Sequence, residues 1–384
     1  MAEVDWHRCK FLESAENLKP LVKMRFGREP STSIAREIAS CLLQGRLFYQ
    51  AAASSPLEIR PLQQFYGIVN FAKALVVASR LSTLATLRPS HGLTDISAGN
   101  SRIADLRLRI DKVGTFQEFN DVVAPFSRLC YIDNATRWRT VALPSSTSAP
   151  LSSVELSLTD ILSRIPRLES LFQLTFGEEA RTGIINLETP YQDDQGFQIR
   201  IGDPQLFSDR DTLKLIVDRW RSRFPFLNIW RLQAAQHGWG NSIIYFRNMH
   251  KNNIDEFSDA YLGYQNGTFQ ELPVPGDTNS RFALENGFYS LAGGWLGGPI
   301  YAVSPIANLY ISEFSIQYMG LFLLSSLVRY RPQTWVHAIS RSSSQTEPAD
   351  DRSLSLIERF LDLNQAEIPD MVVTILNPHE DDFA

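Results

Sequence analysis

The chain has 384 residues, of which 44% are hydrophobic and 21% are charged, and its formal net charge is −5 at pH 7. This composition is ordinary for a globular protein with enough residues for two or three domains. The acidic balance excludes a global basic field of the kind that draws proteins to nucleic acid or to membrane surfaces.

Three features predict a cytoplasmic protein without membrane contact. The cysteines Cys9, Cys41 and Cys130 form no CxxC pair, which favours a reducing compartment. The N-terminal segment MAEVDWHRCK lacks the apolar region of a signal peptide. The longest apolar run, at 319–328, is well short of the about 20 residues that a bilayer-spanning helix needs.

The first hundred residues are predicted to be helical. Apolar residues at helical spacing predict one helix from about Ser33 to near Ser54. Proline suits the first turn of a helix and disfavours helix in the residue before it, so the prolines of SSPLEIRP predict a second helix that starts between Leu57 and Pro61. The short joint predicts a helical hairpin of fixed direction.

The middle of the chain mixes strand and helix patterns. Alternation predicts a strand at 103–110, and helical spacing at 156–174 predicts a helix that Pro166 kinks or splits. Further on, the patterns predict strands at 183–191 and 196–202 joined by QDDQ, a helix at 209–224, a strand at 241–246 and a hairpin at 261–274 around Asn266-Gly267.

The last part of the chain returns to helical patterns, strongly apolar at 306–343 and amphipathic at 353–376. Apolar helices at both ends need partners that shield them from water, and each end can cover the other. We therefore predict an α+β fold. A discontinuous helical bundle is built from residues 1–100 and 305–384, and a mixed α/β segment at 101–304 is inserted between them.

Three segments carry a resemblance to a known family: PLEIRPLQQFYGIVNFAKALV, HGL at 91–93, and LSSLVRYRPQTW at 324–335. Together they resemble the YaaC-like family of bacterial proteins. The resemblance implies an intracellular protein of a family without a settled activity, so no catalytic residue can be carried over. The positions that match its pattern are Pro61, Tyr66, Gly67, His91, Gly92, Arg331, Pro332 and Trp335.

Polar residues on and around the second helix form the candidate binding site. Asn70 and Lys73 share a helix face, and a histidine before a glycine in a loop can bind a phosphate or a carboxylate. Our leading hypothesis is a non-catalytic interaction or regulatory module with a polar cleft, which binds a protein partner or forms a homodimer and uses no cofactor. The candidate residues are Arg60, Tyr66, Asn70, Lys73, Arg88 and His91.

Each of these residues also has a structural interpretation. Arg60 and Lys73 could pair with nearby acidic residues at the surface, and His91 could be a hydrogen-bonded structural histidine.

The alternative hypothesis is a HEPN-like ribonuclease or toxin-type effector, with a role in phage defence and RNA as its substrate. Such enzymes pair an arginine that stabilises phosphate charge with a histidine that moves a proton. Arg331 and His337 have this spacing, as do Arg231 and His237, although two matches are near the number expected by chance. Arg331 could instead cap the preceding helix, with Trp335 packed beneath it.

Other familiar chemistries lack their motifs. The sequence contains no HExxH, EF-hand loop, P-loop or GxSxG elbow. We therefore predict no metal site and disfavour a serine hydrolase.

Overall fold

The structure, a computed structural model, describes residues 5–99, 102–126, 128–133, 137–142, 146–188, 198–238, 240–247, 256–263, 291–293, 300–339 and 353–378. The chain forms two compact units. The helical unit contains Met1–Phe126, Ser145–Ala180 and Ile311–Phe383, and the sheet unit contains Ser127–Pro144 and Arg181–Tyr310.

The N-terminal part of the helical unit begins with four helices. These are α1 (Trp6–Leu12), α2 (Ala15–Phe26), α3 (Thr32–Ser54) and α4 (Arg60–Arg80). Ser31 caps α3 by accepting a hydrogen bond from the Ile34 amide, and a proline lies in the first turn of α4. The predicted helix pair and its proline joint are thus confirmed.

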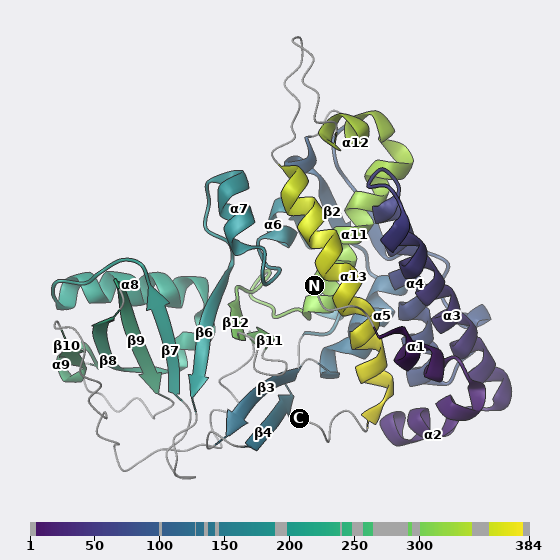
Figure 1. Ribbon diagram of the computed structural model, residues 1–384, viewed down its shortest axis with the longest axis horizontal. Helices are drawn as coiled ribbons and strands as arrows, with labels where there is room; N and C mark the ends of the chain where they lie inside the picture. Colours follow the sequence, from purple (N-terminus) through teal and green to yellow (C-terminus); the bar gives the residue numbers. More distant parts are fainter. Residues whose placement is uncertain are drawn as a thin grey trace. The chain divides into compact units, whose positions relative to one another are not determined.

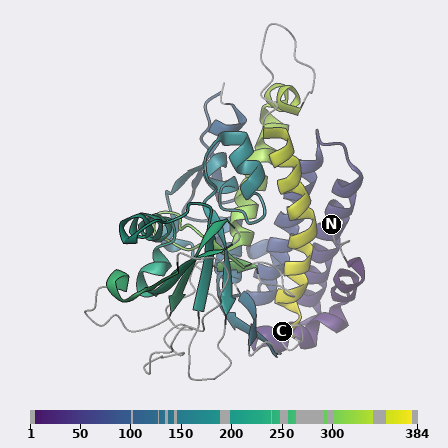
Figure 2. The same ribbon diagram turned by 60° about the vertical axis from the view of Figure 1, so that its left-hand side comes forward.

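Helices from the other end of the chain complete the bundle. They are α11 (Glu313–Tyr330), α12 (Pro332–Ile339) and α13 (Leu354–Leu376). Both α11 and α13 pack against α4, and Figures 1 and 2 show the yellow α13 running alongside the purple N-terminal helices. The predicted α+β class, with helices from both chain ends in one bundle, is confirmed.

Smaller elements fill the rest of the helical unit. Strands β1 (Leu93–Asp95), β2 (Arg107–Ile110) and β5 (Glu155–Ser157) form an antiparallel sheet in the order β1-β2-β5, and β1 and β2 contact α11. The helices are α5 (Thr115–Val123), α6 (Leu158–Leu162) and α7 (Glu169–Phe176), with 3-10 turns at Leu84–Thr86, Ile103–Asp105, Ala124–Phe126 and Ala149–Leu151.

Two predictions in these elements are refined by the structure. Pro166 lies between α6 and α7 and splits the predicted helix at 156–174. The apolar segment predicted to be helical from residue 306 becomes helical only at Glu313, where α11 begins.

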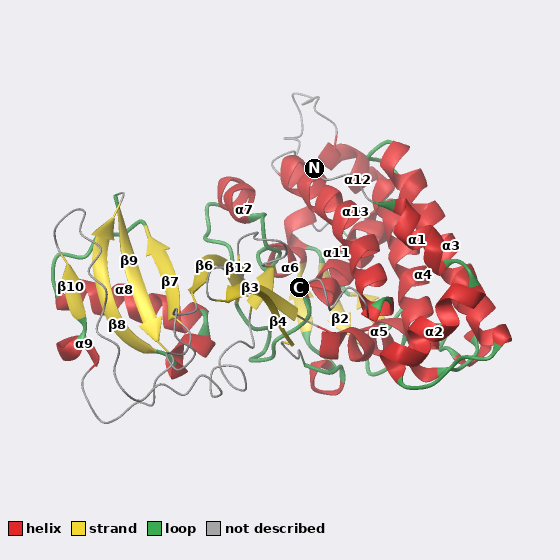
Figure 3. Ribbon diagram, turned by 60° about the horizontal axis from the view of Figure 1, so that its bottom comes forward, coloured by secondary structure: helices red, strands yellow, loops and turns green. Residues whose placement is uncertain are grey.

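The described strands of the sheet unit form a seven-stranded sheet in the order β10-β8-β9-β7-β6-β12-β11, whose strands are labelled in Figure 1 and most of which are drawn in yellow in Figure 3. Neighbours are antiparallel except β10 and β8, which are parallel. Its strands are β6 (Thr182–Glu188), β7 (Gln198–Asp203), β8 (Arg231–Gly238), β9 (Asn241–Arg247), β10 (Tyr261–Gly263), β11 (Leu291–Gly293) and β12 (Ile300–Val303). A separate hairpin joins β3 (Arg128–Asp133) and β4 (Arg137–Ala142).

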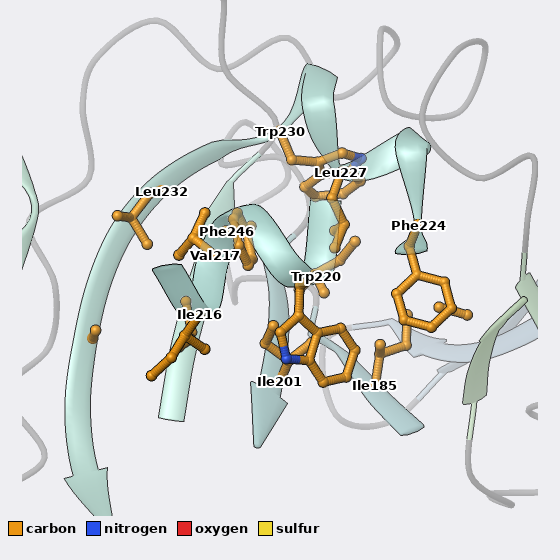
Figure 4. Close-up of a cluster of buried hydrophobic side chains, with 14 of the residues drawn as sticks. Ile185, Ile201, Ile216, Val217, Trp220, Phe224, Leu227, Trp230, Leu232 and Phe246 are labelled. Carbon is orange, nitrogen blue, oxygen red and sulfur yellow. The ribbon is translucent and has the colours of Figure 1, made fainter. Parts of the chain in front are cut away.

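One face of the large sheet packs against α8 (Arg210–Arg223) and the 3-10 turn Pro225–Ile229, and the short helix α9 (Glu256–Asp259) lies near β8. Figure 4 shows the buried side chains between these layers, with Trp220 and Phe224 next to Ile201 and Ile185 of the sheet and Val217 beside Phe246. The predicted strands on either side of QDDQ pair as β6 and β7. QDDQ itself and Asn266-Gly267 lie outside the described residues.

Candidate functional site

Three of the predicted binding residues lie on one face of α4. Tyr66, Asn70 and Lys73 follow one another at spacings of four and three residues, which places them in successive turns of the same helix face. The Asn70 side-chain nitrogen donates a hydrogen bond to the Tyr66 carbonyl oxygen at 2.8 Å. The Tyr66 ring lies 5.7 Å from the ring of Phe48 on α3. Packing on α3 and the local hydrogen bond therefore hold this face in place.

His91, in the loop before β1, packs against α4 and α11 through aromatic contacts. Its ring lies edge-on to Phe65 of α4 at 5.1 Å, and 6.3 Å from Phe322 of α11. Burial is the main effect that lowers the pKa of His91, and the positive charges of Arg329 and Lys73 lower it further. The imidazole is therefore held neutral by its apolar surroundings and by two neighbouring cations.

Arg329, in the last turn of α11, was not predicted from the sequence. Its guanidinium carbon lies 5.6 Å from the centre of the Phe65 ring, so Phe65 contacts both Arg329 and His91. Arg329 Nε donates to the Ser325 carbonyl oxygen at 3.3 Å. The sequence feature that could have indicated Arg329 is the pair of arginines in RYRP, at the end of a strongly apolar helix.

The cluster carries an excess of positive charge. Within the part of the chain that the structure describes, no salt bridge joins Lys73 or Arg329 to an acidic side chain. The charges that act on His91 are both positive. We call Lys73, His91 and Arg329 the basic cluster. Charges brought together in this way repel one another unless an anion binds between them.

Two other predicted binding residues do not join the basic cluster. Arg60 lies at the start of α4, where its Nη2 contacts Asp362 of α13 at 2.6 Å. Arg88 lies exposed in the loop before β1. Arg60 therefore joins two helices, as its structural interpretation predicts.

Arg331 forms an ion pair with Asp95 of β1. Its Nη1 lies 3.2 Å from a carboxylate oxygen of Asp95, and its Nη2 donates to the Ser97 carbonyl oxygen at 3.0 Å. The side chain of His337 is outside the described part of the structure, although its backbone belongs to α12. The geometry thus shows a structural contact for Arg331, and the catalytic role of this pair stays a prediction.

The second arginine–histidine pair lies on a strand. Arg231 and His237 belong to β8, and a ring nitrogen of His237 is 2.7 Å from the Phe207 carbonyl oxygen. The histidine ring also packs edge-on to Phe207 at 4.7 Å. His237 therefore has a structural hydrogen bond and an aromatic contact.

Comparison with protein-family models assigns the chain. The model of the YaaC-like protein family matches residues 10–376. The chain belongs to the YaaC-like family. Neither the curated proteins nor the solved structures gave a match. The predicted resemblance is confirmed over nearly the whole length of the chain.

One YaaC-like motif position, Trp335, contacts the proline joint. The Trp335 indole, from RYRPQTW, donates to the Glu58 carbonyl oxygen at 2.9 Å, and its side chain is buried. Glu58 lies between Pro56 and Pro61, where prolines limit the backbone hydrogen bonds that the joint can make itself. A late motif of the chain therefore stabilises the joint between the two early helices.

The HGL motif contains a glycine that cannot be replaced easily. Gly92 has a φ of +77°, and a Cβ there would lie 2.0 Å from the Gln117 side-chain oxygen. The Gln117 amide nitrogen in turn donates to the Gly92 carbonyl oxygen at 2.8 Å. This close contact fixes the loop that presents His91.

Two further structural findings concern metals and membranes. Over the described ranges, no three or more His, Cys, Asp or Glu side chains are grouped so that they could hold a metal ion. No helix in those ranges has the length and apolar character needed to cross a bilayer.

Proposed function

We propose that this YaaC-like protein is a non-catalytic binding module whose ligand presents an anionic group to the basic cluster. The ligand is a small molecule, or a segment of a protein partner or of a second copy of the chain, met in the cytoplasm. The supporting observation is that the positive charges of Lys73 and Arg329 both lower the pKa of His91, while neither residue forms a salt bridge to a described acidic residue.

Like charges at one site are unfavourable. Lys73 and Arg329 both disfavour protonation of His91, and burial adds to this effect. A bound anion would offset these positive charges and raise the pKa of His91, which favours the imidazolium. The contacts of Phe65 with both His91 and Arg329 hold two of the three groups before any ligand arrives.

Sulfate is a suitable probe because its charge stays constant between pH 5 and pH 8. We expect it to bind more tightly as the pH falls, by at most about tenfold per pH unit, because binding favours protonated His91. NMR titration of the His91 ring, at constant ionic strength, would give both the affinity and the His91 pKa with and without sulfate.

Three variants test where the anion binds. Lys73→Gln and Arg329→Gln should each weaken sulfate binding by about tenfold or more, because each removes a charge-assisted contact. Lys10→Gln, an exposed residue of α1 with the same change of charge, should leave it unchanged. Equal binding by all three variants, or an unchanged His91 pKa in saturating sulfate, would contradict the proposal.

The ribonuclease hypothesis remains the competing one. It predicts RNA cleavage by the purified protein that Lys73→Gln retains and His337→Ala removes. Neither the family assignment nor the contact between Arg331 and Asp95 supports it.

A further inference from the structure

A second cluster of charged groups lies in the helical unit. Glu313 begins α11, Glu367 lies in α13, and Arg167 lies in the turn before α7. Arg167 Nη2 lies 3.2 Å from a carboxyl oxygen of Glu313 and 2.6 Å from one of Glu367. Only 16% of the Glu313 side chain and 18% of the Glu367 side chain are exposed. One guanidinium therefore serves two largely buried carboxyl groups.

This arrangement keeps a proton on Glu367. Burial raises the pKa of Glu367 to about 8, and the charge of Glu313 contributes to that rise, while Arg167 and a hydrogen bond from Gln317 oppose it. Two carboxylates at one site cannot both ionise cheaply, so Glu367 holds a proton at neutral pH. The Gln317 amide nitrogen donates to Glu367 at 2.8 Å.

The pair is connected to the interior of the bundle. The Gln317 side-chain oxygen accepts a hydrogen bond from Asn364 at 3.1 Å, and the Asn364 oxygen accepts one from the Tyr49 hydroxyl at 2.7 Å. Asn364 and Glu367 lie three residues apart in α13, so both face the same side of that helix. Polar contacts thus continue from the carboxyl pair on α11 and α13 to α3.

We propose that Glu313 and Glu367, bridged by Arg167, form a proton-dependent latch, in which a proton on Glu367 allows α13 to pack against α11 and loss of that proton loosens α13. The charged groups that act on Glu367 come from two other elements, Glu313 of α11 and Arg167 of the turn before α7. When the proton leaves for solvent, two negative charges face one guanidinium. With this latch, the packing of the C-terminal helix α13 would depend on pH.

Proton binding to Glu367 and the closing of α13 are thermodynamically linked. Glu367 binds its proton more tightly in the closed state than in the open state, where its pKa returns towards the ordinary value of 4.5. The free energy of closing is therefore most favourable below that pKa value and becomes less favourable as the pH rises. The contribution of the Glu367 proton is lost once the pH exceeds about 8. The opening equilibrium should increase by up to about tenfold per pH unit between pH 5 and pH 7.

Amide hydrogen exchange of the full chain, with rates corrected for intrinsic exchange, measures this opening at α13 and at α4. We expect the α13 opening constant of the wild type to rise with pH and to level off near pH 8. Glu367→Gln, a neutral isostere, should remove the rise, and Glu358→Gln, on the same helix and without a contact to the pair, should keep it. Arg167→Gly should move the levelling to higher pH, because the cation that lowers the pKa of Glu367 is gone.

Two results would overturn the latch. One is a pH dependence at α13 that persists in Glu367→Gln. The other is an equal pH dependence at α4 and α13, which would show global unfolding driven by other groups. If Glu367→Gln does not fold, Glu313→Gln tests the same pair, because it removes the second negative charge, lowers the pKa of Glu367 and should move the levelling to lower pH. An unchanged levelling pH in Glu313→Gln would then overturn the latch.

Discussion

Asp95 holds together the segment around the C-terminal end of α11. Its carboxylate accepts hydrogen bonds from the Ser326 hydroxyl at 2.6 Å and the Ser97 amide at 2.9 Å, and it lies 3.2 Å from Arg331. Burial alone would raise its pKa, but these hydrogen bonds and the charge of Arg331 outweigh burial, so the pKa is lowered. The carboxylate is thus stabilised in its ionised form.

We predict that Asp95→Ala destabilises the protein by about 2–3 kcal/mol, because it leaves the Arg331 side chain, of which 16% is exposed, without its counterion. The Asp95 contribution should also decline as the pH falls through its lowered pKa. Urea unfolding of Asp95→Ala, Arg331→Ala and the double variant gives the coupling between the two residues.

The matched control for this cycle is the exposed pair Arg107 and Glu155, for which we expect a coupling near zero. A coupling below about 0.5 kcal/mol between Asp95 and Arg331 would show that their contact is not structural. That result would leave Arg331 free for the role that the ribonuclease hypothesis gives it.

At the same scale, helical spacing was enough to place Tyr66, Asn70 and Lys73 together, because residues three and four apart share a helix face. Arg329 could not be found in this way. Its place in the basic cluster depends on a contact with Phe65, which lies on a helix from the other end of the chain. Sequence spacing carries no information about such a contact.

At the scale of the elements, two glycines allow α3 and α4 to approach closely. A Cβ at Gly45 would lie 2.4 Å from the Phe71 ring, and one at Gly67 would lie 2.5 Å from the Tyr49 ring. Gly67 closes the FYG segment that matches the YaaC-like pattern. The glycine of this motif therefore serves helix packing.

We predict that Gly67→Ala destabilises the protein by about 1–3 kcal/mol, even though alanine favours helix, because the buried Tyr49 ring has no room to move. Thermal and urea unfolding would measure the loss. Gly99→Ala, where a Cβ would meet nothing within 4 Å, is the control and should be nearly neutral. If the Gly67→Ala protein were as stable as the wild type, α3 and α4 would have to be able to separate slightly without cost.

Element types were predictable where periodicity and proline act locally. The joint between α3 and α4 and the split at Pro166 follow from the geometry of the proline ring. The parallel pairing of β10 with β8 could not be predicted, because strand partners depend on contacts across the sheet. The same holds for the 3-10 turn at Ile103–Asp105, within a segment whose alternation predicted only a strand.

At the scale of the whole molecule, the bundle joins the two ends of the chain by polar as well as apolar contacts. Arg25 of α2 donates to the carbonyl oxygens of Ile375 at 2.6 Å and Thr374 at 3.0 Å, near the end of α13. The need to cover apolar helices predicted that the ends would meet. It could not predict which polar groups pair, because many side chains offer the same donors and acceptors.

The hydrogen bond between Tyr49 and Asn364 tests how much these polar contacts contribute. Both side chains are fully buried, on α3 and α13. Tyr49→Phe removes only the hydroxyl and leaves the Asn364 oxygen without its donor, so we predict a loss of about 1–3 kcal/mol. Asn364→Leu should also be destabilising, because it leaves the tyrosine hydroxyl without its acceptor and the Gln317 side-chain oxygen without its donor.

The double variant Tyr49→Phe/Asn364→Leu should lose less free energy of unfolding than the two single variants together. It removes both polar groups of this hydrogen bond, so neither is left buried without the other. Urea unfolding of the four proteins gives the coupling energy, and Tyr330→Phe, at a side chain that is 71% exposed, is the control with no expected change. If Tyr49→Phe proved neutral, this hydrogen bond would contribute nothing to stability. The association of the two chain ends would then depend on apolar packing and on the remaining contacts of α13.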